Sequence, residues 1–198
     1  MIKRLLICGA LLLALPASAQ AKKTTCSSGK TDLVHGRTRV FHTRDHWYLC
    51  SARLRHPREF MDSGTDGAYA KPSAFRMFGS RIGFAVYWED AVTGGWDADW
   101  IDVRTGEVRY TEITPDTPLP AADAQAVAVD ADGSLAFIEG DETGQWIGYA
   151  RNGVHRFHAT KLLTTQTPGD VVPDSLSYAG GVVSWTTTSG VTSSLPAS

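Results

Sequence analysis

Long hydrophobic runs are scarce in this chain of 198 residues. The longest, at residues 5–15, has 11 residues, whereas a helix that crosses a bilayer needs roughly 20. Two basic residues precede the run, and a proline and the small residues Ala17-Ser18-Ala19 follow it, which is typical of a secretory signal peptide. We therefore expect cleavage after Ala19 or Ala21. Residues 22–198 would then form a single exported domain, periplasmic or extracellular, with no integral membrane segment.

Cysteine is scarce as well. Of three cysteines, Cys8 lies in the leader, which leaves Cys26 and Cys50 in the mature chain. A pair of cysteines in an exported protein favours a disulfide. A redox pair would usually have the Cys-x-x-Cys spacing, and one cysteine pair with scattered histidines is a poor set of metal ligands. We predict a Cys26–Cys50 disulfide, no metal and no cofactor.

An excess of positive charge is absent. The full chain has a net charge of −2, and removal of two basic residues with the leader leaves −4, which argues against nucleic acid as a partner. The charge is nevertheless uneven, with a net of +7 over residues 22–81 and −11 over residues 82–198. Opposite charges would help the first and last parts of a ring to meet. Alternatively, the basic part would face an anionic envelope polymer.

Helical periodicity is missing too. No stretch after residue 22 keeps apolar residues at helical spacing for more than about two turns. Short runs rich in β-branched and aromatic residues alternate instead with glycine, aspartate, asparagine and proline, which is typical of strands joined by turns. The clearest turns are Thr105-Gly106, Asp132-Gly133, Asn152-Gly153 and Gly180-Gly181. The sequence therefore predicts an all-β, antiparallel fold.

The predicted strands group into four units of three or four strands. They lie at residues 39–41, 48–51 and 58–60; at 75–78, 81–88, 98–103 and 108–110; at 126–129, 135–139, 146–150 and 154–157; and at 175–178, 182–185 and 191–195. Four aromatic residues at similar places, Phe41, Phe84, Phe137 and Trp185, are separated by 43, 53 and 48 residues. Up to four antiparallel strands every 40 to 50 residues or so is the spacing of propeller blades.

Four segments, at residues 102–110, 132–138, 147–157 and 174–185, carry a resemblance to a known family. Their strand, Asp-Gly or Asn-Gly turn and aromatic strand resemble the blades of secreted bacterial β-propeller proteins, loosely the TolB-like kind. Propellers of six to eight blades need well over about 250 residues, so this chain is expected to form about four blades, as a ring or an open stack. The resemblance implies binding or scaffolding more than catalysis, and it transfers no active-site residue.

Motifs that carry chemistry are few. The Gly-x-Ser-x-Gly nucleophile elbow is absent from the sequence. Residues 130–134 differ from a calcium loop because their glycine is fourth rather than sixth, so a hairpin turn is expected there. His42 and His46 flank a polar turn, and His155 and His158 would face opposite sides of a strand. All four histidines are interpreted as surface residues.

The segment Trp96-Asp97-Ala98-Asp99-Trp100 is the most unusual one. As a strand, it would place Trp96 and Trp100 on one face and Asp97 and Asp99 on the other. Exposed tryptophans beside carboxylates would suit a sugar-binding surface, and paired carboxylates about 5–9.5 Å apart would suit a glycosidase. The alternative is that the tryptophans belong to the core and the acids are solvated. Trp96, Asp97, Asp99 and Trp100 are the candidate binding residues.

The sequence thus favours an exported, non-enzymatic, propeller-like domain that binds a protein or a cell-envelope polymer such as a polysaccharide. The alternative is a secreted carbohydrate-active hydrolase that uses carboxylates of residues 97–102. A purely structural repeat domain is the third possibility. Convergence of acids from several blades in one pocket would favour the hydrolase over the structural role, because propeller sites draw residues from several blades.

Overall fold

The computed structural model describes residues 24–64, 69–89, 94–109, 123–140, 144–152 and 160–197. Within these ranges, the only helical element is the 3-10 helix η1 (Pro173–Ser175), and the remaining elements are strands in four antiparallel sheets. Among the residues that the structure describes, no helix is long and apolar enough to cross a membrane. The all-β, propeller-like class expected from the sequence is confirmed.

Each sheet is built from strands that follow one another in the chain. The first contains β1 (Lys30–His35), β2 (Thr38–Thr43), β3 (His46–Cys50) and β4 (Arg58–Asp62). The second contains β5 (Tyr69–Phe78), β6 (Arg81–Glu89), β7 (Gly94–Asp102) and β8 (Val108–Arg109). The third contains β9 (Asp123–Val129), β10 (Leu135–Gly140), β11 (Gln145–Ala150) and β12 (Thr160–Gln166). The fourth contains β13 (Ser177–Ala179), β14 (Val182–Thr186) and β15 (Thr192–Pro196).

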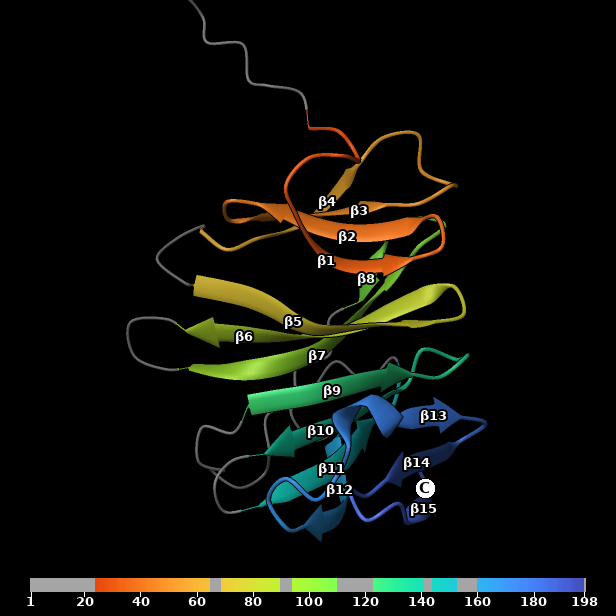
Figure 1. Cartoon of the computed structure of the whole chain (residues 1–198). Helices are drawn as coiled ribbons and strands as arrows, with labels where there is room; N and C mark the ends of the chain where they lie inside the picture. Colours follow the sequence, from red (N-terminus) through yellow and green to blue (C-terminus); the bar gives the residue numbers. More distant parts are fainter. Residues whose placement is uncertain are drawn as a thin grey trace, which may run out of the picture.

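The four sheets form an open stack rather than a ring. The first strand of each sheet approaches the first strand of the next, from β1 to β5, then to β9 and β13. Figure 1 shows the first sheet at one end of the molecule and the last sheet near the other. The interpretation that opposite charges join the first and last sheets is therefore wrong. The alternative, that the basic part faces an anionic polymer, stays a prediction.

Several strands differ from the sequence prediction, and β5 and β7 begin six and four residues earlier than expected. β1 was not expected, and it forms by antiparallel pairing with β2 although most of its side chains are exposed. The last strand of the third sheet described by the structure lies at Thr160–Gln166, where it pairs with β11, and the strand predicted at residues 154–157 lies outside the described ranges. Residues 153–159, including the Gly153 of the predicted Asn-Gly turn and both His155 and His158, lie outside the described ranges. Tyr110, the end of another predicted strand, also lies outside them.

The second sheet lies between the first and the third, and both of its faces are apolar. Along β6, Phe84 packs toward the first sheet, in a cluster that includes Leu49 and Phe60. The intervening Ala85 packs toward the third sheet, in a cluster with Phe137. This strict alternation is what the pleat of a strand produces when both faces are buried.

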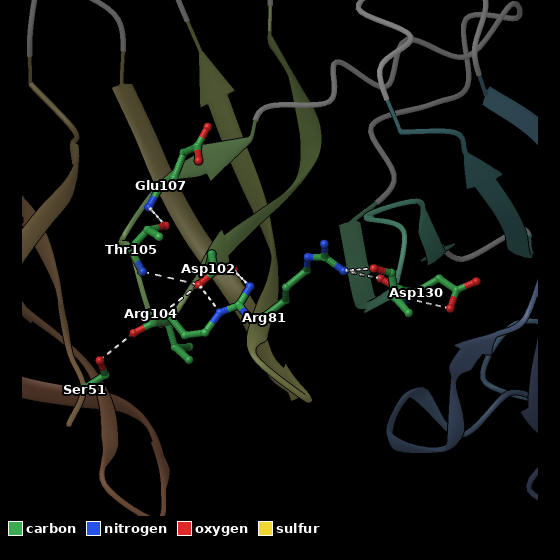
Figure 2. A network of polar contacts seen from close by, with 9 residues as sticks. Ser51, Arg81, Asp102, Arg104, Thr105, Glu107 and Asp130 are labelled. Carbon is green, nitrogen blue, oxygen red and sulfur yellow. Dashed lines mark hydrogen bonds and ion pairs between the residues drawn. The ribbon is translucent and has the colours of Figure 1, made fainter. Parts of the chain in front are cut away.

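Polar contacts at the turns join neighbouring sheets (Figure 2). The Ser51 hydroxyl donates to the carbonyl of Val103 at 2.5 Å, which links the first sheet to the second. Arg81 Nη1 donates to the carbonyl of Asp130 at 2.9 Å, which links the second to the third. The Asp130 carboxylate then accepts hydrogen bonds from the N–H groups of Gly180 and Gly181 in the fourth sheet.

Asp102 organises the turn that presents Val103. Its carboxylate accepts hydrogen bonds from the backbone N–H of Arg104 at 2.7 Å and from the Arg104 guanidinium at 2.7 Å and 3.2 Å. The bond from the Arg104 side chain, assisted by the backbone bonds, lowers the pKa of Asp102 below its ordinary value, although burial opposes it. The carboxylate is therefore ionised in the folded protein at neutral pH.

A depressed pKa stabilises the fold above the unfolded value of about 3.9, and this stability is lost as pH falls through the folded value. We expect Asp102→Asn to lower the free energy of unfolding by about 1 kcal/mol at pH 7, the upper end for a partly exposed ion pair. The difference between the variant and the wild type should shrink below about pH 4. Urea unfolding at pH 7 and pH 3 measures both quantities. A pH-independent difference would contradict the assignment, and Glu107→Gln, which breaks the exposed pair with Arg109, is the control.

The predicted disulfide is formed. Cys26 and Cys50 are bonded, with their Cα atoms 5.8 Å apart, a separation typical of such bridges. The bond ties the segment before β1 to the end of β3. Arg39 holds the same segment through hydrogen bonds from its guanidinium to the carbonyls of Ser28 and Gly29. A disulfide is consistent with an exported protein.

Candidate functional site: an acidic pocket between the first two sheets

An open pocket of about 520 Å³ lies between β4 of the first sheet and β5, β6 and β7 of the second. This volume is within the range of ordinary ligand sites. Its lining combines four carboxylates with aromatic and aliphatic side chains: Glu59, Phe60, Met61, Asp62, Ala70, Val86, Trp88, Asp97 and Asp99. The pocket contains the acids of two sheets that are separate units in the sequence.

Asp97 and Asp99 reach the pocket because of the alternation along β7. Their positions lie opposite Val86 and Phe84 of β6, on the face that packs toward the first sheet. On the same face, the next alternate residue, Ile101, is part of the apolar core. Asp99 is only 1% exposed, whereas Asp97 is half-buried. Along this face of β7, the apolar core between the two sheets therefore ends at Ile101, and the acidic residues Asp99 and Asp97 follow it.

Trp96 and Trp100 lie on the other face of β7. Each is 7% exposed, and both belong to the apolar cluster between the second and third sheets. The Trp96 ring packs edge to face on Phe137, with the ring centroids 5.2 Å apart. The Arg81 guanidinium lies 4.6 Å above the Trp100 ring. Of the four candidate binding residues, the structure thus brings Asp97 and Asp99 to the pocket and places the two tryptophans in the core.

Glu59 and Asp62 reach the pocket from β4 through an irregularity in the sheet. On β3, the neighbouring residues Trp47 and Tyr48 pair with Met61 and Glu59, so β4 has one extra residue between these pairs. Two residues three apart would face opposite sides of a regular strand. The extra residue compensates for the odd spacing, so the carboxylates of Glu59 and Asp62 lie on the same side of the sheet as His46, and both residues belong to the pocket lining.

His46 adjoins these two acids from the start of β3. Its Nδ1 lies 3.1 Å from Glu59 Oε1 and 3.8 Å from Asp62 Oδ2. The hydrogen bond with Glu59 raises the pKa of His46 above its ordinary value, and the charges of Asp62, Glu59 and Asp45 add to this while burial opposes it. Sequence reasoning placed His46 correctly beside a polar turn, but it missed both carboxylate neighbours because they come from a strand 13 or more residues away.

The other candidate motifs lie apart from the pocket. His42 pairs with Asp32 of β1, with its Nδ1 2.8 Å from Asp32 Oδ2, and is not among the lining residues. Residues 130–134 form the expected turn between β9 and β10. There, the Asp132 carboxylate accepts hydrogen bonds from the backbone N–H and the hydroxyl of Ser134, at 2.7 Å and 2.9 Å.

The chain matches no protein-family model and no curated protein. Among solved structures, it is similar to the crystal structure of Porphyromonas gingivalis dipeptidyl peptidase 4, with 11% sequence identity and a TM-score of 0.49. The match covers 76% of this chain and 28% of the peptidase chain. A likeness at this level carries no argument about activity, and the fold described above stands on its own sheet topology.

Proposed function

We propose that this domain is an exported binding module whose acidic pocket receives a basic side chain of a protein partner. The observation that carries the proposal is that four acidic residues, from β4 and β7, line one open pocket. Like charges gathered in a cleft with low-dielectric walls focus the electric field and attract ligands of the opposite charge. An anionic polymer would be repelled from this pocket, whereas a lysine or arginine side chain would be attracted.

The aromatic lining supports the same ligand. Two aromatic residues, Phe60 from β4 and Trp88 from β6, line the pocket. An aromatic face attracts a cation within about 6 Å of the ring, and the aliphatic stem of lysine or arginine packs well on apolar surface while its charge stays near solvent. The pocket therefore offers both the charge and the apolar contact that a basic side chain requires.

Binding of a tetralysine peptide, measured by isothermal titration calorimetry in metal-free buffer, tests this proposal. We expect binding that weakens at high salt and that Asp97→Asn reduces by about fivefold, equivalent to about 1 kcal/mol for a partly exposed ion pair. Glu107→Gln, which removes an exposed acid outside the pocket, should leave the affinity unchanged. A tetraglutamate peptide should not bind. Absence of tetralysine binding, or an equal effect of both variants, would refute the proposal.

Glycoside hydrolysis is the second candidate, favoured by the convergence of Asp97 and Asp99 with Glu59 and Asp62 in one pocket. Such enzymes need one carboxylic acid that protonates the leaving group and one carboxylate that acts as base or nucleophile. The test is release of reducing sugar from soluble cellulose, xylan and starch derivatives. A hydrolase would release sugar, and Asp97→Asn would abolish or strongly reduce the rate. No release at high protein concentration would leave binding as the function of the pocket.

A further inference from the structure

Three side chains at the rim of the acidic pocket form a cluster of metal-ligand type. One ligand atom each from His46, Glu59 and Asp62 lies within 4.8 Å of the others. The donor atoms of a tetrahedral zinc site, each about 2.0–2.2 Å from the metal, are about 3.4 Å apart. The two separations from His46 Nδ1, 3.1 Å to Glu59 and 3.8 Å to Asp62, lie on either side of this value.

The backbone holds the three groups in place. His46 and Asp62 are direct partners across β3 and β4, and the extra residue in β4 places Glu59 on the same side. The second carboxylate oxygen of Asp62 accepts a hydrogen bond from the N–H of Gly64 at 3.1 Å. Outer hydrogen bonds of this kind orient metal ligands and are a regular feature of protein metal sites.

The donor set selects a class of metal. Magnesium and calcium prefer oxygen ligands alone, and calcium takes six to eight of them. A combination of imidazole nitrogen and carboxylate oxygen suits zinc and related first-row metals. Three protein ligands would leave one position of a tetrahedral site for water or another small ligand.

We propose that His46, Glu59 and Asp62 bind one Zn²⁺ ion, or a chemically similar divalent transition metal, with one coordination position left open. This site goes beyond the proposed binding of a basic side chain. It needs no peptide, and it does not use Asp97 or Asp99.

The experiment is titration of the purified, disulfide-bonded protein with ZnCl₂ alone, followed by calorimetry, with MgCl₂ as the comparison. We expect one Zn²⁺ per chain and no Mg²⁺ binding at the same concentrations. His46→Gln and Asp62→Asn should each weaken Zn²⁺ binding at least tenfold. His42→Gln is the matched control because His42 also contacts a carboxylate on the first sheet, and among the described residues it belongs to no group of three metal ligands.

The variants separate this site from the peptide-binding pocket. Asp97→Asn should weaken tetralysine binding and leave Zn²⁺ binding unchanged, whereas His46→Gln should weaken Zn²⁺ binding and leave metal-free tetralysine binding unchanged. Circular dichroism and thermal melting confirm that each variant is folded. If His46→Gln unfolds, the near-isosteric Asp62→Asn tests the loss of Zn²⁺ binding, and Asp97→Asn alone tests the separation from the pocket. The metal site is refuted if the wild type does not bind Zn²⁺, or if His42→Gln weakens binding as much as His46→Gln does.

Discussion

Phe84→Ala is expected to lower the free energy of unfolding by about 3–5 kcal/mol, the usual cost of truncating a buried phenylalanine. Phe84 is 0% exposed, at the centre of the contact between the first two sheets. Its ring packs against Phe75 and Phe60, with centroid distances of 5.4 Å and 5.5 Å. The loss combines the transfer free energy of the removed ring with the cavity that the two neighbouring rings cannot fill.

Guanidinium chloride unfolding at pH 7 measures this loss as a shift of the midpoint at constant slope. Phe84→Leu keeps most of the apolar volume and should cost clearly less, so it provides a folded comparison if the alanine variant does not fold. Val34→Ala, at a position that is 63% exposed, is the control and should change stability by less than about 0.5 kcal/mol. If Phe84→Ala cost no more than Val34→Ala, the packing of the first sheet on the second would be wrong.

The effect should extend to the acidic pocket. Phe60, whose ring contacts Phe84, lines the pocket between Glu59 and Met61. Loss of the supporting ring removes the contact that orients Phe60. We therefore expect Phe84→Ala, where it folds, to weaken tetralysine binding as well as stability, whereas Val34→Ala should affect neither.

Removal of the disulfide by Cys26→Ser with Cys50→Ser is expected to lower the free energy of unfolding by about 3.5 kcal/mol. In the unfolded chain, the bond closes a loop of about 25 residues and so lowers the chain entropy. This value is the free energy that corresponds to that loss of entropy. For a domain of this size it corresponds to a decrease of about 7–14 °C in melting temperature. The hydrogen bonds of Arg39 to Ser28 and Gly29 remain in the variant, so the segment before β1 should stay docked.

Differential scanning calorimetry of the double variant, of the wild type and of the wild type with reductant measures the effect. The reduced wild type and the double variant should melt at the same temperature, because both lack the same constraint. Quantitative alkylation of both thiols in unreduced, unfolded wild type would contradict the bond itself. Equal melting temperatures for oxidised wild type and the double variant would show that the bond does not constrain the unfolded chain.

Alternation and turn chemistry made the candidate site partly predictable. The segment from Trp96 to Trp100 has period two, so the sequence predicted correctly that Asp97 and Asp99 share a face opposite the tryptophans. Which face would be buried against another sheet could not be predicted, because a pleat determines only that the faces differ. The apolar clusters on both sides of the second sheet show that the tryptophans are core residues and that the acids border a pocket.

The other two acidic residues of the pocket, Glu59 and Asp62, could not be predicted from the sequence to share a face. Glu59 and Asp62 are three residues apart, a spacing that assigns them to opposite faces of a regular strand. One extra residue in β4, visible only in its pairing with β3, brings both to the side of His46. Such an irregularity depends on the register between two strands, and a single strand contains no signal for it.

Local sequence determined the strands, the turns and the cysteine pair of this protein, since each depends on neighbouring residues or on a choice among very few cysteines. Even there, β1 was missed because its side chains are mostly exposed and its conformation comes from backbone pairing with β2. Tertiary structure alone decided that the sheets stack openly and that β4 and β7 bring four carboxylates to one pocket. The reason is that the sheets contact one another through their apolar faces, and many arrangements of the same strands would bury those faces. Strand register and the close fit of side chains select one of these arrangements.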